Sequence, residues 1–190
     1  MRVLIINGSR NPSFTAALAQ AMGVALDAFG VEVRLAGLAA PPGADDTCGW
    51  LRQAVAESEA VVLTSPVHHC GYSGLLKAAL DTLPGGAFAD RAVGLLAQGS
   101  SPHTGRVVCE QLRTVATSLG GWVVPTHIAA SRLDFTLPPG GRPTPSPQLL
   151  RHCRVLAGEL HRCVSALAVR PGRPGRNQPE ERWRVPIVSH

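Results

Sequence analysis

The chain has 190 residues, of which 45% are hydrophobic and 16% charged, and its formal net charge is +5. This length is typical of one domain with a packed core, and the mean hydropathy of +0.10 argues against a disordered chain. No apolar run approaches the roughly 18 residues of a membrane span, and the N-terminus lacks a secretory signal pattern. Because only 4% of residues are aromatic, the basic charge does not indicate nucleic-acid binding. We therefore expect a cytoplasmic protein with neither a nucleic-acid nor a membrane partner.

The five cysteines form no C-x-x-C pair and their number is odd. In a chain without an export signal, this pattern predicts reduced thiols and no metal site. The residues concerned are Cys48, Cys70, Cys109, Cys153 and Cys163.

Strand and helix patterns alternate along the chain, which is typical of βαβ units with a parallel sheet. In the first helix, Leu18, Met22 and Leu26 recur at four-residue spacing, and Gly30 follows as a stop. The expected strands are 2–6, 31–38, 60–65, 91–97 and 121–130, and the expected helices are 13–29, 47–58, 73–83, 106–119 and 147–169. We therefore predict an α/β domain over residues 1–169, with a flavodoxin-like, doubly wound, five-stranded parallel sheet in the order 2-1-3-4-5 and helices on both faces.

Three segments stand outside this alternation. Residues 40–43 are expected to form a Pro/Gly loop, and the proline-rich stretch 137–147 is expected to be a loop or a lid without regular structure. The Arg/Pro/Gly-rich tail, residues 170–190, is expected to be mobile or to dock on a neighbouring subunit.

The first strand leads into a loop whose side chains suit a phosphate group. Ser9, Ser13 and Thr15 supply hydroxyls, Arg10 supplies a forked cation, and the helix that follows contributes its positive end. The alternative interpretation is that Ser13 is a helix N-cap and Arg10 a solvated turn residue. Neither the G-x-x-x-x-G-K-[ST] nor the G-x-G-x-x-G pattern is present, which disfavours nucleotide hydrolysis and a standard NAD-binding half.

Two further loops follow the third and fourth strands and open at the same edge of the predicted sheet. Pro66 stiffens the chain where it leaves the third strand, and we expect Gly71 and Gly74 to permit the turn back into a helix. The fourth strand ends in a loop that contains Gly99, Ser100 and Ser101. The three loops together predict a site for a phosphorylated planar cofactor, namely a flavin.

The stretch from Ser65 to Asp81, SPVHHCGYSGLLKAALD, resembles the P-x-Y-x-x-S-x-S-G-x-L-K-x-x-L-D signature of the NADPH-dependent FMN reductases. Residues 8–13, GSRNPS, are similar to the phosphate loop of that family, G-S-x-R-x-x-S. The resemblance covers residues 1–169 and is closest to the reductases of two-component alkanesulfonate monooxygenase systems. The chain departs from the signature at His68, where the family has tyrosine, and at Gly71, where it has serine.

This resemblance implies an oxidoreductase that transfers a hydride from NADPH or NADH to FMN and supplies reduced flavin to a partner monooxygenase. It also implies a homodimer or homotetramer, in which Lys77 and Asp81 have a structural role. Hydride transfer needs no acid or base side chain, so we name no catalytic residue. The implied FMN-binding residues are Ser9, Arg10, Ser13 and Thr15 at the phosphate, Pro66, Val67, His68 and His69 along the ring, and Gly99, Ser100 and Ser101 at its other edge.

Two alternatives stay open at this point. One is a flavoenzyme with retained FMN that reduces a quinone, an azo compound or a specialised metabolite, in which His68 serves as a general acid rather than as a stacking plane. The other is a non-enzymatic, flavodoxin-like electron carrier, which the basic charge disfavours.

Overall fold

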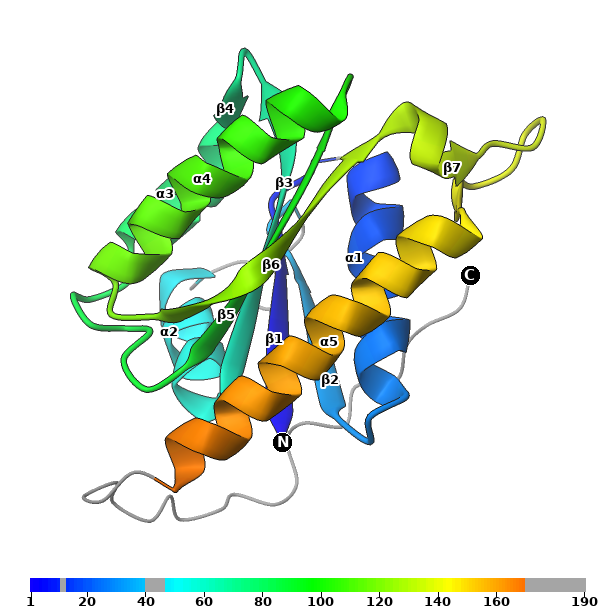
Figure 1. The fold of residues 1–190 in the computed structure, drawn as a ribbon. Coiled ribbons are helices and arrows are strands. Elements are labelled where there is room, and N and C mark those ends of the chain that lie inside the picture. The colour runs from blue at the N-terminus through cyan, green and yellow to red at the C-terminus, as the bar shows by residue number, and fades with distance from the viewer. Residues whose placement is uncertain (11–12, 40–46, 170–190) are drawn as a thin grey trace.

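The computed structural model describes residues 1–10, 13–39 and 47–169, and Figure 1 shows a twisted sheet between two layers of helices. Five parallel strands lie in the order β2-β1-β3-β5-β6, which confirms the predicted order 2-1-3-4-5. They are β1 (Arg2–Asn7), β2 (Glu32–Gly37), β3 (Ala60–His68), β5 (Ala92–Gly99) and β6 (Trp122–Ser131). The residues 40–43 and the tail 170–190, about which the sequence made predictions, lie outside the described residues.

The helices follow the predicted ranges within a few residues. They are α1 (Phe14–Asp27), α2 (Thr47–Glu57), α3 (Gly74–Asp81), α4 (Pro102–Ser118) and α5 (Pro147–Ala168). Helices α1 and α5 cover one face of the sheet, and α2, α3 and α4 cover the other. Within the described residues, no helix is long and apolar enough to cross a lipid bilayer.

Strand side chains alternate between the two hydrophobic cores because successive residues of a strand point to opposite faces. Val3, Ile5 and Val62 pack with α1 and α5, whereas Leu4 and Leu63 pack with α2, α3 and α4. All five side chains are fully buried. This two-sided burial explains why the central strands are almost continuously apolar.

Two small hairpins differ from the predicted elements. Strand β3 continues to His68 and pairs antiparallel with β4 (Gly71–Tyr72), where the sequence predicted a loop after residue 65. The proline-rich stretch is not wholly irregular, since β8 (Thr144–Pro145) pairs with β7 (Phe135–Thr136) after a short 3-10 helix, η1 (Arg132–Asp134). Proline at the edge of a two-stranded ribbon loses no ladder bond, so the high proline content does not prevent this pairing.

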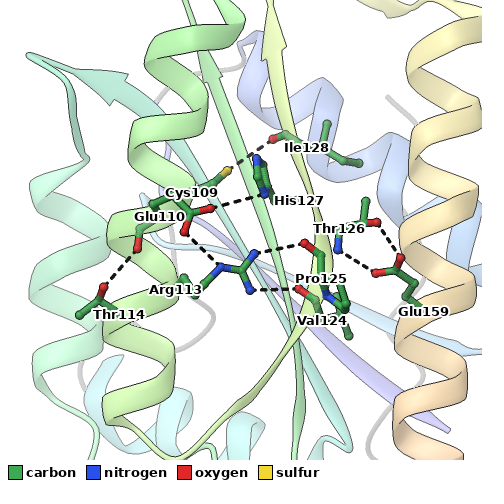
Figure 2. Close-up of polar contacts among 10 residues, drawn as sticks. All are labelled: Cys109, Glu110, Arg113, Thr114, Val124, Pro125, Thr126, His127, Ile128 and Glu159. Atoms are coloured by element: carbon green, nitrogen blue, oxygen red, sulfur yellow. Dashed lines mark hydrogen bonds and ion pairs between the residues drawn. The ribbon is translucent and has the colours of Figure 1, made fainter.

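The edge strand β6 contains a bulge. Its register with β5 shifts between Val93 and Leu95, which pair with Val123 and His127, so that residues 124–126 oppose only Gly94. Figure 2 shows that side chains from both layers satisfy the backbone there: Arg113 of α4 donates to the carbonyl oxygens of residues 124 and 125, and Glu159 of α5 accepts from Thr126.

Candidate flavin site

The loop after β1 lies against the carboxyl-terminal half of β3 and the N-cap of α3. Gly8 N donates to Thr64 O at 2.8 Å, and Ser73 Oγ donates to Gly8 O at 2.7 Å. A Cβ at Gly8 would lie 2.8 Å from Leu76 Cβ and 2.9 Å from Ser73 Oγ. Glycine is therefore required here by the close approach of the loop to α3.

The hydroxyls predicted for the phosphate gather at the N-terminus of α1. Ser9 Oγ and Ser13 Oγ lie 2.9 Å apart, and Ser13 is the N-cap residue of α1 but its side chain makes no capping hydrogen bond. Ser13 therefore occupies the N-cap position, as the alternative interpretation expected, but its hydroxyl does not cap the helix. By contrast, the serine side chains at the starts of α3, α4 and α5 all cap their helices.

Thr15, like Thr64 of β3, has a buried hydroxyl without a partner among the described residues. The Thr15 side chain is 1% exposed, and within the described residues its Oγ1 has no hydrogen-bond partner. A buried hydroxyl without a partner costs about 1–3 kcal/mol, so such groups are uncommon unless a ligand or water satisfies them. Arg10, the remaining residue of the predicted phosphate set, is exposed.

The first and second loops are joined by a serine pair that the sequence reasoning did not single out. Ser73 N donates to Ser65 Oγ at 2.9 Å, and Ser73 Oγ accepts from Leu76 N at 3.1 Å while donating to Gly8 O. Ser73 thus caps α3 and fixes the phosphate loop with one hydroxyl. The sequence did contain a signal for this role, because the predicted helix begins with Ser73 and serine is a preferred N-cap residue.

The second loop is a β-hairpin whose turn consists of His69 and Cys70. Their φ angles of 49° and 59° are the positive values that two-residue primed turns require. Gly71 and Gly74, which were expected to permit the turn back into the helix, follow this turn, and neither has positive φ. Left-handed backbone costs a non-glycine residue roughly 1–2 kcal/mol, and Gln111 of α4 supports the turn by donating to Cys70 O at 3.0 Å.

The four residues predicted to line the flavin ring lie at the end of β3 and in the hairpin turn. Pro66 and Val67 are half-buried, and Pro66 pairs in register with Gln98 of β5. His68 and His69 are both exposed at the end of the hairpin that extends beyond the sheet. They therefore stand where a ligand above the sheet edge could contact them.

The third loop packs closely on the second. A Cβ at Gly99 would lie 2.8 Å from both Val67 Cγ2 and Thr104 Oγ1. Ser101 caps α4 by accepting from Thr104 N at 3.3 Å, and Ser100 is exposed. The close contact at Gly99 brings loops two and three together at the carboxyl edge of β3 and β5.

Lys77 and Asp81 form an exposed i,i+4 ion pair on α3, with Lys77 Nζ 2.6 Å from Asp81 Oδ1. The hydrogen bond to Asp81 raises the pKa of Lys77. In the described part of the chain, the hydrogen bonds and ion pairs of these two side chains do not reach the three loops, and their structural role stays a prediction.

The residues present fit a flavin mononucleotide. The donor set at the α1 N-terminus consists of hydroxyls and the positive end of a helix, which suits a dianionic phosphate. The partnerless Thr15 Oγ1 lies in that first turn, and the three loops meet at the sheet edge where doubly wound folds bind ligands.

Comparison with known proteins identifies the family. The sequence profile described as NADPH-dependent FMN reductase matches residues 1–134. The chain belongs to the NADPH-dependent FMN reductase family. Among its relatives, an FMN reductase (NADPH) of Pseudomonas aeruginosa is 31% identical over 147 residues, which are 70% of this chain and 77% of that protein.

A second relative is similar over a shorter stretch. The FMN-dependent NADPH-azoreductase of Staphylococcus saprophyticus is 38% identical over 89 residues, and the match covers 45% of this chain and 45% of that protein. The match thus spans less than half the length of that relative. Among solved structures, the apo form of the NADH:FMN oxidoreductase EmoB has a TM-score of 0.63 at 23% identity, over 90% of this chain and 91% of that one, which supports the flavodoxin-like fold of this reductase-family member.

Proposed function

We propose that this protein is an NAD(P)H-dependent FMN reductase. The observation that carries the proposal is the arrangement at the start of α1 in a chain of this family. The buried Thr15 hydroxyl has no partner among the described residues, and the side chain of the N-cap residue Ser13 makes no capping hydrogen bond. When bound, FMN would supply the hydride acceptor for the nicotinamide of NADPH or NADH.

In this proposal the protein binds and orients its ligands rather than donating or removing protons. The phosphate is held by Ser9, Arg10, Ser13 and Thr15. The ring lies along Pro66, Val67, His68 and His69, with Gly99, Ser100 and Ser101 at its other edge. The Ser73 hydrogen bonds and the Gln111 contact keep the loops in place, so that less order must be gained on binding.

The proposal has two further parts. The protein supplies reduced FMN to a separate monooxygenase, and it assembles as a homodimer or homotetramer. A second candidate function is reduction of an azo compound or quinone on retained FMN. It is favoured by the 38% identity to an azoreductase over 89 residues and by the two exposed histidines at the site.

The test follows the absorbance of NADPH or NADH with purified protein while FMN is added in steps. A colourless protein with a saturating dependence on free FMN would support the shuttling reductase. A yellow protein that needs an azo dye or quinone but no added FMN would support the second candidate. Failure to oxidise either nucleotide with any of these acceptors would contradict both.

A further inference from the structure

A cation not assigned to the site lies beside the first residue of α1. The guanidinium carbon of Arg132 lies 5.5 Å from the centre of the Phe14 ring, and Phe14 follows the N-cap Ser13 directly. The same ring makes an edge contact with Phe135, with a centroid distance of 5.2 Å and an interplanar angle of 63°. Phe14 thus places Arg132 beside the helix that begins at the phosphate loop, and Phe135 supports the Phe14 ring.

The backbone around Arg132 is fixed independently of this contact. Asp134 Oδ2 accepts from Ser131 N at 2.7 Å and from Ser131 Oγ at 3.0 Å, which forms a capping box at η1. Strand β6 ends at Ser131, so its carboxyl end places Arg132 at the same edge of the sheet as the three loops. In Figure 1, β7 and the end of β6 lie beside the top of α1.

The electrostatics at this position favour an anion. A helix N-terminus carries a partial positive charge, so both it and the exposed Arg132 guanidinium attract an anion placed between them. The first turn of α1 contains no acidic residue, and the nearby Asp134 carboxylate accepts from Ser131. Within the described part of the chain, Arg132 makes no ion pair.

We propose that Arg132 binds the phosphate of FMN together with the first turn of α1, and that it thereby selects FMN over riboflavin. This inference rests on the proposed function. The planar guanidinium presents several N–H donors in a fork that matches phosphate oxygens, and stacking on an aromatic ring keeps that fork pre-organised. The serine and threonine hydroxyls contact the phosphate from the helix, and Arg132 contacts it from the β6 side.

The test measures dissociation constants of FMN and riboflavin from the quenching of flavin fluorescence. Arg132→Met removes the charge and keeps an apolar stem over Phe14. We expect it to weaken FMN binding about fivefold to twentyfold and riboflavin binding less than about twofold. The FMN affinity of the wild type should also fall with added salt more steeply than that of the variant.

Arg142→Met is the matched control. Arg142 is an exposed arginine in the loop between β7 and β8, and its replacement by methionine removes the same charge. It should leave both dissociation constants unchanged. Arg132→Lys should fall between the wild type and Arg132→Met, since lysine keeps the charge but not the flat fork.

Equal losses for FMN and riboflavin in Arg132→Met would overturn the proposal, because they would show a structural role only. Unchanged FMN binding in that variant would also overturn it. A wild-type protein that binds neither flavin would instead contradict the proposed function, so the two failures are distinguishable. Riboflavin binding by the variant serves as the check that its site is folded.

Discussion

The buried hydroxyl of Thr15 has opposite consequences for the free and the flavin-bound protein. Because it is 1% exposed and lacks a described partner, replacement by the nearly isosteric valine removes a desolvation cost. We predict that Thr15→Val raises the free energy of unfolding of the flavin-free protein by about 1 kcal/mol. The same variant should weaken FMN binding about tenfold, since one phosphate donor is lost.

Urea unfolding without flavin and fluorescence titration with FMN measure the two effects. Thr117→Val is the matched control, because Thr117 is an exposed threonine in α4, far along the chain from the loops. It should change neither quantity appreciably. If Thr15→Val destabilised the free protein, the hydroxyl would have a partner within the fold and the assignment to the phosphate would lose its support.

At this scale the sequence indicated which residue types occupy the phosphate loop but not how they are bonded. Serine and threonine after a buried strand predict either a cap or a ligand site. The 2.9 Å contact between Ser9 and Ser13, the missing capping bond from Ser13 and the partnerless Thr15 hydroxyl favour the ligand site. The Arg132–Phe14 contact joins residues more than one hundred positions apart, so no local pattern could indicate it.

Among the elements, the bulge of β6 depends on two charged side chains. Arg113 Nη1 and Nη2 donate to Val124 O at 3.2 Å and Pro125 O at 3.3 Å, while Glu159 Oε2 accepts from Thr126 N at 2.9 Å. Pro125 itself lacks an N–H group. These contacts leave few free backbone groups for another strand to pair with at an otherwise exposed sheet edge.

We predict that Arg113→Met and Glu159→Ala each lower the free energy of unfolding by about 1–2 kcal/mol, because each leaves backbone groups of the bulge without partners. The double variant should also self-associate, as the unprotected edge pairs with a second copy. Urea unfolding and light scattering after gel filtration measure the two outcomes. Arg154→Met, which removes an exposed arginine from α5, is the control. A stable, non-associating double variant would contradict the protective role.

His127 neighbours the same contacts and adds a pH dependence. Burial lowers its pKa, although Glu110, 3.8 Å away, acts in the opposite direction, and Arg113 and Arg106 lower the pKa further. Since the pKa in the folded protein lies below that of the unfolded chain, the stability linked to His127 is present above the unfolded value and is lost as the pH falls through the folded one.

Predictability from sequence differed between regular and irregular elements. Long periodic helices and apolar strands were located within a few residues, because burial on one or both faces imposes a repeating pattern. The hairpin turn at His69 and Cys70 was missed, since neither residue favours positive φ. The bulge was missed as well, although Pro125 within a predicted strand was a signal for an edge or a bulge.

On the scale of the whole molecule, each of the two cores contains a buried thiol. Cys109 lies in the core beneath α4 and Cys153 in the core beneath α5, and both are fully buried. Burial raises the pKa of Cys109 to about 12 and that of Cys153 to about 12, from an ordinary value of 9.0. Cys109 Sγ donates to Ile128 O at 3.7 Å, as Figure 2 shows.

These raised pKa values predict that the fold is labile in alkali. The folded protein keeps both thiols protonated while the unfolded chain releases their protons above about pH 9, so stability is complete below that pH and is lost as the pH rises toward 12. At about pH 10.5, each thiol should lower the free energy of unfolding by about 2 kcal/mol.

Cys109→Ala should therefore reduce the loss of stability between about pH 7 and pH 10.5 by about 2 kcal/mol, whatever its effect at neutral pH. Urea unfolding under reducing conditions measures this difference. Cys70→Ala, which replaces an exposed cysteine, is the control and should leave the alkaline loss of stability unchanged. An identical alkaline loss in Cys109→Ala and the wild type would assign the effect to other titrating groups.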